Sequence, residues 1–165
     1  MKITLFAAIM ANGNYMHGDG DYRWAKEVFQ DFDSCALESG NCIVGRKTYD
    51  EYASTGGGFG DLAVVVVSRT ADSIPGTIVA NSPSQAIQQL ELLGHSSALV
   101  GGGDSLLNAF LAEGLADEII VNLTPELGGI GNHVQLQGNS YQSMELLSVR
   151  ELGQGILRLH YRLIK

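Results

Sequence analysis

The chain is short of basic residues, and this shortage excludes several classes of partner. Its 165 residues include ten Lys and Arg against eighteen Asp and Glu, for a formal net charge of −8. Sequence-independent nucleic-acid binding needs a surplus of cations that displace counterions from phosphates, and anionic membranes attract polybasic segments for the same reason. We therefore expect no nucleic-acid partner and no membrane partner.

Cysteine and histidine are scarce as well. Cys35 and Cys42 are too few for a disulfide framework, and the four histidines show no H-x-x-x-H spacing. The apolar run at the N-terminus ends at Asn12-Gly13, too early for a signal peptide or a membrane-spanning helix. These absences predict a reduced, cytoplasmic protein without a bound metal.

Glycine, by contrast, is abundant, with 21 residues. The hydrophobic share of 45% is enough for a sizeable core, and the charged share of 17% is too low for a disordered chain. Glycine is used where the backbone turns sharply or approaches a ligand closely. In a well-packed chain, this much glycine therefore predicts a backbone that turns sharply or approaches a ligand closely.

Apolar runs and helical patterns alternate along the chain, without a linker or repeat. Strands are expected at 3–10, 42–44, 62–67, 77–80, 98–100 and 118–123. Helices are expected at 21–39, 46–52, 82–93 and 104–113. On the first helix, Trp24, Ala25, Val28, Phe29, Phe32, Cys35 and Ala36 share one face. The third helix opens with the cap Ser82, a proline and Gln85 of a capping box, and buries Ala86, Ile87, Leu90 and Leu93.

The last residues follow a different pattern. Segments 144–152 and 157–164 flank a Gly-Gln-Gly turn and predict an antiparallel hairpin. Alternation places Leu159, Tyr161 and Leu163 inward and Arg158, His160 and Arg162 outward, on a solvated face. The whole pattern predicts a single α/β domain with three layers: a mainly parallel central sheet, helices on both faces, and this hairpin at one edge.

Three strand ends share one sequence pattern, in which a buried apolar strand is followed directly by small or polar residues. They are Val44-Gly45-Arg46-Lys47-Thr48, Val67-Ser68-Arg69-Thr70 and Val100-Gly101-Gly102-Gly103-Asp104-Ser105. Ligands of open α/β sheets bind beyond the carboxyl ends of strands, and helix N-termini there suit phosphate. The helix dipole disfavours cations in a first turn, so Arg46 and Lys47 indicate an anionic ligand. Three such ends fit a dinucleotide better than a mononucleotide.

In this order and spacing, the segments resemble the dihydrofolate reductase-like superfamily. Ile43 to Tyr49 matches the signature (I/V)(M/V)GRKT(Y/W), and Phe6 to Gly13 is similar to the first strand and the loop that closes over the nicotinamide. Residues 102–111, 114–119 and 124–129 resemble the reductase domain of the riboflavin-biosynthesis deaminase/reductase, RibD. The zinc deaminase motifs of that protein are missing, so deamination is not expected.

The resemblance implies NADPH as cofactor, and names the residues that would hold it. Cations near the 2′-phosphate favour NADPH over NADH, and an unusual peptide bond is implied in the Gly-Gly segment. The implied cofactor-binding residues are Ala8, Gly45, Arg46, Lys47, Thr48, Ser68, Arg69, Thr70, Gly101, Gly102, Gly103, Asp104, Ser105 and Leu106.

The substrate side is less well defined by the sequence. A folate reductase carries an acid on its first helix, and here the candidates for that catalytic role are Glu27 and Asp31. Both also fit a solvated helix face, which is the more common place for an acid. Further candidates for substrate contact are Asn12, Trp24, Asn122 and Thr124, with a place in the core as the alternative for Trp24. His17, in the closing loop, fits either ligand contact or solvent exposure.

The function that follows is an NADPH-dependent reductase delivering hydride to a pyrimidine- or pterin-like heterocycle. The resemblance points to an activity like that of 5-amino-6-(5-phosphoribosylamino)uracil reductase. A true dihydrofolate reductase is one alternative, although the Pro-Trp loop of that enzyme is missing. A non-catalytic NADP(H)-binding protein is the other. The resemblance also implies a homodimer.

Overall fold

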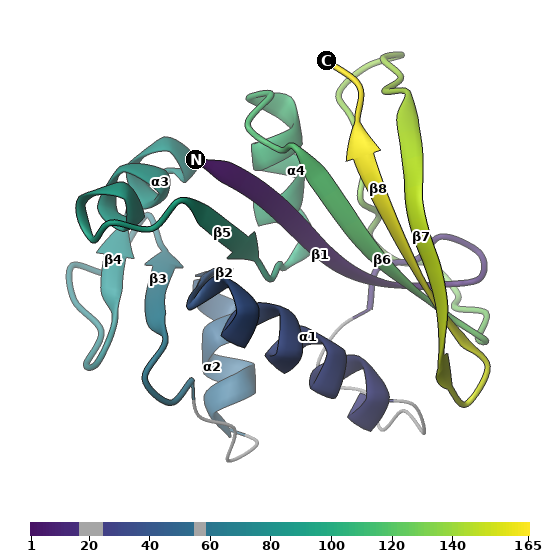
Figure 1. Ribbon diagram of the computed structural model, residues 1–165, viewed down its shortest axis with the longest axis horizontal. Coiled ribbons are helices and arrows are strands. Elements are labelled where there is room, and N and C mark those ends of the chain that lie inside the picture. Colours follow the sequence, from purple (N-terminus) through teal and green to yellow (C-terminus); the bar gives the residue numbers. More distant parts are fainter. Residues whose placement is uncertain (17–24, 55–58) are drawn as a thin grey trace.

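The apolar runs of the sequence become strands of one sheet in the computed structural model, which describes residues 1–16, 25–54 and 59–165 (Figure 1). Among these residues, eight strands pair in the order β4-β3-β2-β5-β1-β6-β8-β7. Their bounds are β1 (Lys2–Met10), β2 (Asn41–Gly45), β3 (Ala63–Val67), β4 (Ile78–Ala80), β5 (Ser97–Val100), β6 (Glu118–Thr124), β7 (Met144–Gly153) and β8 (Ile156–Leu163).

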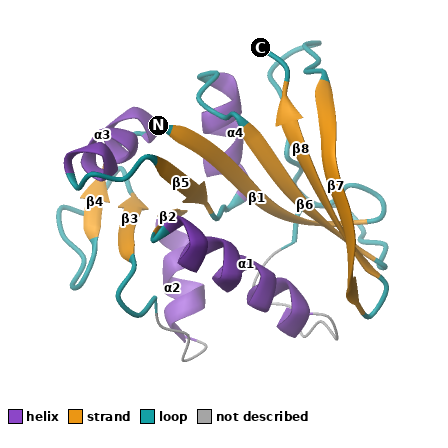
Figure 2. Ribbon diagram, viewed as in Figure 1, coloured by secondary structure: helices purple, strands orange, loops and turns teal. Residues whose placement is uncertain are grey.

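Helices cover both faces of this sheet, as the sequence predicts (Figure 2). They are α1 (Ala25–Ser39), α2 (Arg46–Ser54), α3 (Pro83–Leu92) and α4 (Asp104–Ala112). The strands from β4 to β6 run parallel, whereas β8 and β7 are antiparallel. Right-handed crossovers place α1 and α2 on one face and α3 and α4 on the other. In the described part of the chain, no helix has the length and apolarity to cross a membrane.

The core has two layers, one on each side of the sheet. Leu5 packs in the layer with Leu90 and Phe110, whereas its neighbour Phe6 packs in the layer with Phe32. Successive side chains of a strand point to opposite faces, so a central strand covered on both faces needs apolar residues at every position. This explains why the parallel strands are unbroken apolar runs in the sequence.

The start of α3 confirms the predicted cap. The Ser82 hydroxyl accepts the Gln85 backbone N–H at 3.2 Å. The Gln85 side chain accepts the N–H of Asn81, one residue before the cap, at 2.6 Å. Two residues predicted to lie on buried helix faces are at the surface instead: Phe29 is 39% exposed and Leu93 is 57% exposed. Phe29 still contacts the ring of Tyr52, at 6.1 Å between ring centroids, and Leu93 is the last residue of the predicted helix.

The hairpin is present, but the prediction that Arg158 and His160 face solvent is wrong. Arg158 is only 8% exposed and His160 is half-buried, whereas Arg162 is exposed as predicted. The hairpin face expected to meet water lies beside α1, which supplies Asp31 to Arg158. Alternation alone could not reveal a helix that covers the charged side of the strands.

A second charged group lies at the amino edge of the sheet. Glu118, 7% exposed, accepts from the Lys2 ammonium at 2.9 Å and pairs with His160 Nε2 at 2.8 Å. Burial works to raise the pKa of the Glu118 carboxyl, but the hydrogen bonds from Lys2 and His160 outweigh it and hold the pKa below its ordinary value. This group stabilises the fold far from the strand ends discussed next.

Candidate active site

The strand ends singled out in the sequence lie together at the carboxyl edge of the sheet. β3, β2 and β5 are parallel neighbours, so three adjacent strands end here. Gly45 is the last residue of β2, whereas Ser68 and Gly101 directly follow β3 and β5. After β2 the chain turns into α2 on one face, and after β5 it turns into α4 on the other. Connections that leave to opposite faces open a crevice between them, which is where ligands of such sheets bind.

A glycine turn forms the floor of this edge. The Gly101 N–H donates to the Ile43 carbonyl and the Gly45 N–H to the Gly102 carbonyl, both at 2.8 Å. A cis peptide bond joins Gly102 and Gly103, as the family resemblance implied. A Cβ on Gly101 would lie 2.5 Å from the ring of Phe32, and Gly102 has φ of +87°. Only glycine fits at these two positions.

The N-terminus of α4 opens directly from this turn. Gly103 is its N-cap and supplies no side-chain hydrogen bond, so no cap side chain occupies the N–H groups of Asp104 and Ser105. Such a terminus suits a phosphate group. Leu106 does not belong to it, because its N–H donates to the Gly103 carbonyl at 3.0 Å and its side chain is buried in the core. The Thr48 hydroxyl borders Gly103 from the α2 side.

The cations of the site differ in their partners. Arg46 Nε donates to both oxygens of Asp50 at 2.8 and 2.9 Å, and Lys47 pairs with Glu51 at 3.6 Å. The carboxylates of Asp50 and Glu51 thus provide these cations with partners inside α2, and an anionic ligand at Arg46 and Lys47 stays a prediction. Arg69 is exposed and pairs with no carboxylate in the described part of the chain.

The turn that carries Arg69 is held by a serine. The buried Ser68 hydroxyl accepts the N–H groups of Thr70 at 3.3 Å and Ala71 at 3.1 Å. Ser68 thus fixes the turn in place, and Thr70 is exposed beside Arg69. An arginine held this way can meet an anion at the edge of the sheet without first leaving a carboxylate.

Tyr15 is a residue of this edge that no sequence pattern indicated. Its hydroxyl packs against Gly102, at the place where any other residue would carry its Cβ. Burial raises the pKa of the Tyr15 phenol, and the carboxylates of Asp104 and Glu51 raise it further. The chain reaches this point by folding back along β1, where the Ala8 carbonyl accepts the Met16 N–H at 3.0 Å. The carbonyl of Ala8 is therefore already engaged.

Asn12 has a structural partner at the surface. Its amide donates to the Gly128 carbonyl at 2.7 Å and accepts the Gly128 N–H at 3.2 Å. Next to it, Asn14 donates to the Gly129 carbonyl at 2.5 Å, and the Tyr15 N–H donates to the Asn132 carbonyl at 2.7 Å. Asn12 therefore binds the loop after β1 to the loop after β6, instead of presenting a free amide to a substrate.

Beneath α1 lies a buried polar cluster. Asp31, 8% exposed, accepts from Arg158 Nε at 3.0 Å and from Asn122 Nδ2 at 3.1 Å, and Arg150 lies 3.6 Å from its other oxygen. The expectation of a solvated helix face is wrong for Asp31. Both oxygens of the Asp31 carboxylate are therefore engaged, by two guanidinium groups and an amide.

Two oxygens near this cluster are buried without a partner: Glu27 Oε2 and Asn122 Oδ1. An unsatisfied buried acceptor costs roughly 1–3 kcal/mol, so native proteins rarely keep one without a reason. Thr124 is buried on the same strand as Asn122, and its hydroxyl donates to the Ile9 carbonyl at 3.3 Å. Trp24 and His17 lie outside the described residues.

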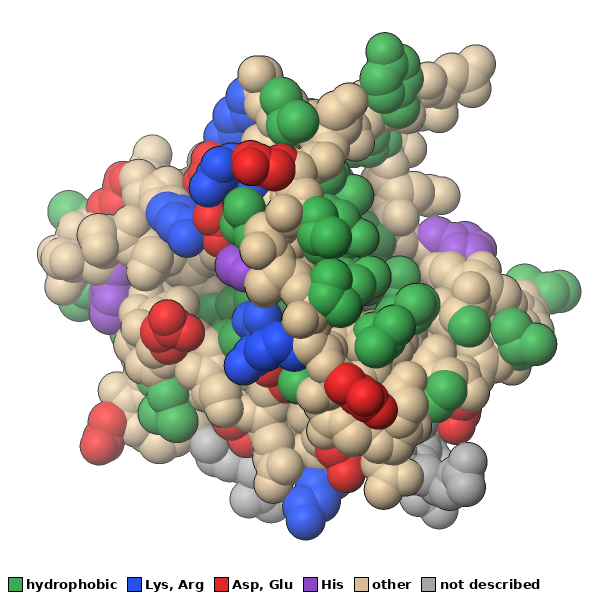
Figure 3. Space-filling view, turned by 45° about the vertical axis from the view of Figure 1, so that its right-hand side comes forward, with side chains coloured by type: hydrophobic (Ala, Val, Ile, Leu, Met, Phe, Trp, Pro, Cys, Tyr) green, Lys and Arg blue, Asp and Glu red, His purple; other side chains and the backbone are tan. Residues whose placement is uncertain are grey.

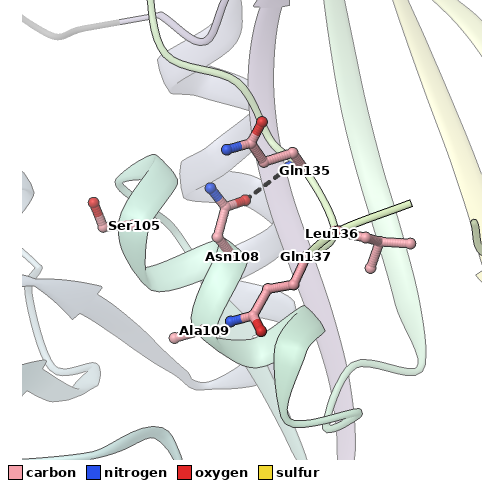
Figure 4. A pocket seen from close by; sticks show the side chains of 7 residues that line it. Ser105, Asn108, Ala109, Gln135, Leu136 and Gln137 are labelled. Carbon is pink, nitrogen blue, oxygen red and sulfur yellow. Dashed lines mark hydrogen bonds between the residues drawn. The ribbon is translucent and has the colours of Figure 1, made fainter. Parts of the chain in front are cut away.

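A groove of about 580 Å³ runs along the outer side of α4 (Figure 4). Ser105, Asn108 and Ala109 line it from the helix, and residues 135–138 line it from the facing loop. Asn108 joins the two sides, since Oδ1 accepts the Gln135 N–H at 2.8 Å and Nδ2 donates to the His133 carbonyl at 3.0 Å. This link supports the loop that in turn binds residues 11–15.

Comparison with known proteins decides the family. The sequence profile of the RibD C-terminal domain matches residues 2–158. The chain belongs to the RibD C-terminal domain family. No curated protein sequence matches this RibD C-terminal domain.

Solved structures confirm a dihydrofolate reductase-like fold for this RibD C-terminal domain. A candidate riboflavin biosynthesis protein from Shewanella sp. PV-4 superposes with a TM-score of 0.82 at 20% identity, covering all of both chains. Acinetobacter baumannii RibD has a TM-score of 0.72 at 20% identity, covering 99% of this chain and 58% of that one. Schistosoma mansoni dihydrofolate reductase has a TM-score of 0.78 at 16% identity, covering 99% of each. Family and fold support a reductase-type function, while a shared fold does not determine the substrate.

Proposed function

We propose that this domain is an NADPH-dependent reductase that delivers hydride to a pyrimidine- or pterin-like heterocycle. One observation carries the proposal. A glycine turn, a helix terminus without a capping side chain, and Arg69, which pairs with no carboxylate among the described residues, follow neighbouring strand ends at one edge of the sheet. Backbone N–H groups at a helix terminus suit a pyrophosphate, and an arginine on a neighbouring strand end suits a 2′-phosphate.

The residues present fit the cofactor in most respects. Phe32 and Tyr15 pack against Gly101 and Gly102, whereas a Cβ on Gly103 would meet only the Thr48 hydroxyl, at 3.4 Å. Asp104 and Ser105, which follow Gly103, would offer their backbone N–H groups to the pyrophosphate. Arg46, Lys47 and Arg69 supply positive charge at this edge. Arg46 and Lys47 pair with carboxylates of α2, whereas Arg69 pairs with none among the described residues. The bound nicotinamide supplies the hydride.

Glu27 is the better candidate for proton delivery. One of its carboxyl oxygens is buried without a partner, whereas Asp31 is held by Arg158 and Asn122. A carboxyl group free of ion pairs can exchange a proton with a substrate or a water molecule. We therefore assign the acid of the proposed reaction to Glu27 and a different role to Asp31.

Cofactor choice tests this function. In an Arg46→Ala/Arg69→Ala variant, we expect the Kd for NADPH to rise roughly tenfold or more, since charge-assisted hydrogen bonds to the 2′-phosphate are lost. The Kd for NADH should change little, because NADH lacks that phosphate. Arg162→Ala, which removes an exposed arginine paired with Glu145, is the control. Equal weakening of both cofactors would contradict the 2′-phosphate assignment.

The two rival functions give different results in the same assays. A dihydrofolate reductase turns over dihydrofolate with NADPH, and Glu27→Gln should then shift its pH profile while Asp31→Asn should not. A non-catalytic binding protein shows NADPH-dependent thermal stabilisation but oxidises no NADPH with dihydrofolate or aminopyrimidine substrates. A cytoplasmic location stays a prediction from the sequence.

We also propose that the domain forms a homodimer through the hairpin. β7 is an edge strand among the described residues, and it exposes Met144, Leu146 and Val149 next to Leu157 of β8. Figure 3 shows hydrophobic side chains gathered on this side of the molecule. Long apolar edge strands are normally covered in soluble proteins.

A second copy suits this edge because β7 carries both an acidic and a basic side chain, Glu145 and Arg150. In the antiparallel register centred between residues 147 and 148, Glu145 of one copy would lie opposite Arg150 of the other, in addition to their partners Arg162 and Asp31 within each chain. We expect a dimer mass by light scattering at micromolar concentration, and a monomer mass for Leu146→Glu/Val149→Glu. A wild-type monomer under those conditions would contradict the proposal.

A further inference from the structure

The buried Asn122 amide on β6 is satisfied on one side only. Asn122 is 0% exposed, its Nδ2 donates to Asp31 Oδ2 at 3.1 Å, and its Oδ1 has no partner. β1 and β8 flank it in the sheet, with Ala8 and Arg158 directly opposite. Because Ala8 and Asn122 are near the carboxyl ends of β1 and β6, the amide lies toward the edge of the sheet at which ligands of such folds bind.

The orientation of this amide is determined by its neighbours. A carboxylate only accepts hydrogen bonds, so the NH₂ of Asn122 must face Asp31 and the carbonyl must face away. Asp31 is in turn held by Arg158 Nε at 3.0 Å, and the Arg158 Nη2 contacts the Cys35 thiol at 3.6 Å. Turning the amide over would set two acceptors against each other. The pair Asp31–Arg158 therefore presents Asn122 Oδ1 as a fixed acceptor.

We propose that Asn122 Oδ1 accepts a ring N–H of the heterocyclic substrate, with Asp31 and Arg158 as positioning residues for the amide. The proposal rests on the reductase function proposed above, and it narrows the substrate class. The ring must carry an N–H donor, as in the lactam of a uracil or an oxopterin. A ring with a bare or alkylated nitrogen at that position leaves Oδ1 without a donor, and a site built around a hydrogen bond discriminates against such a ring.

A matched pair of probes tests this role. We would titrate 5,6-diaminouracil and its 1,3-dimethyl analogue into the protein by calorimetry, with and without NADP⁺. Wild type should bind the N–H form about tenfold more tightly or better, the amount expected for one good hydrogen bond. In Asn122→Leu, which keeps the side-chain volume but removes the acceptor, the ratio should fall below about threefold.

The ratio of the two uracil affinities also tests Asp31 and Arg158 as positioning residues. Asp31→Asn frees the amide to turn over, so the preference for the N–H form should fall as it does in Asn122→Leu. Arg158→Met should act in the same direction, and Arg158→Lys, which keeps the cation, should restore part of the ratio. A purely structural role would lower the melting temperature without changing the ratio.

Glu118→Gln is the control, because it breaks another buried charge group on β6 at the opposite edge of the sheet. It should lower the stability and leave the ratio unchanged. Three results would overturn the role of Asn122 Oδ1 as the acceptor. Wild type could bind both uracils equally, it could bind neither, or Asn122→Leu could leave the ratio unchanged. Loss of NADP⁺ binding would instead count against the proposed function, and the titrations without cofactor separate the two cases.

Discussion

Gly101 is the position where the packing makes the sharpest demand on the sequence. An added Cβ would lie 2.5 Å from Phe32 Cε2, 2.8 Å from Cζ and 3.3 Å from Val44 Cγ1. The ring cannot easily withdraw, because it is 8% exposed and packs edge-on against Phe6 at 5.4 Å and Tyr52 at 6.1 Å. Gly101→Ala is therefore an insertion of one methyl group into a filled site.

Overpacking of this kind costs roughly 1–3 kcal/mol. At about 2–4 °C per kcal/mol for a chain of this size, the melting temperature should fall by about 2–12 °C. Urea unfolding should show the same loss with an unchanged m-value. Gly129→Ala is the matched control, since its Cβ would meet nothing within 4 Å. Both substitutions restrict the unfolded chain equally, so the difference between them isolates the clash.

A second substitution checks the cause. In the Phe32→Leu background the ring is gone, so Gly101→Ala should cost at least about 1 kcal/mol less than in wild type. Strict additivity of the two changes, or a Gly101→Ala variant as stable as Gly129→Ala, would refute the packing argument. The double variant separates this clash from any general intolerance of the glycine turn.

Three further outcomes follow from the structure. In the folded protein the pKa of Glu118 lies below its ordinary value of 4.5. The ionised carboxylate therefore adds its full contribution to the free energy of unfolding above pH 4.5, and this contribution is lost as the pH falls through the folded-state pKa. In urea unfolding at a series of pH values, Glu118→Gln should lower the free energy of unfolding at neutral pH and weaken its decline toward acid pH. Ser82→Ala removes the cap of α3 and should cost about 1 kcal/mol in thermal unfolding, against little for the exposed Ser84→Ala. Burial raises the pKa of the Cys42 thiol to about 12 and raises that of Cys35, so neither should react with a disulfide reagent at pH 8 until the protein unfolds.

The order of elements could be predicted because each strand and helix carries its own local pattern. Buried parallel strands are apolar throughout, and the Ser82 cap lies within three residues of the N–H that it accepts. Contacts across the sheet leave no such local signal. Arg158 looked like a surface residue because the alternation of one strand does not show which helix covers it.

The cation pattern shows the same limit. Arg46 and Lys47 seemed to require an anionic ligand, yet Asp50 and Glu51 stand one turn further along the same helix. This spacing is local and was visible in the sequence, so an i, i+4 pairing could have been weighed against the dipole. Tyr15 was beyond such reasoning, because only the fold brings its hydroxyl to Gly102.

Glu27 and Asp31 of α1 have different surroundings in the structure, although the sequence gives no reason to distinguish them. Glu27 and Asp31 stand four residues apart, so they project from the same side of one helix and fit the same motif position equally well. The difference between them comes from β8, 127 residues further on, where Arg158 donates to Asp31, whereas Glu27 Oε2 is buried without a partner. Burial without a partner keeps a carboxyl group available for chemistry, whereas an ion pair commits it to structure. Arg158, which the alternation of β8 placed in solvent, is thus the residue that distinguishes the two acids, and the proposed role of Glu27 as the proton donor rests on this difference.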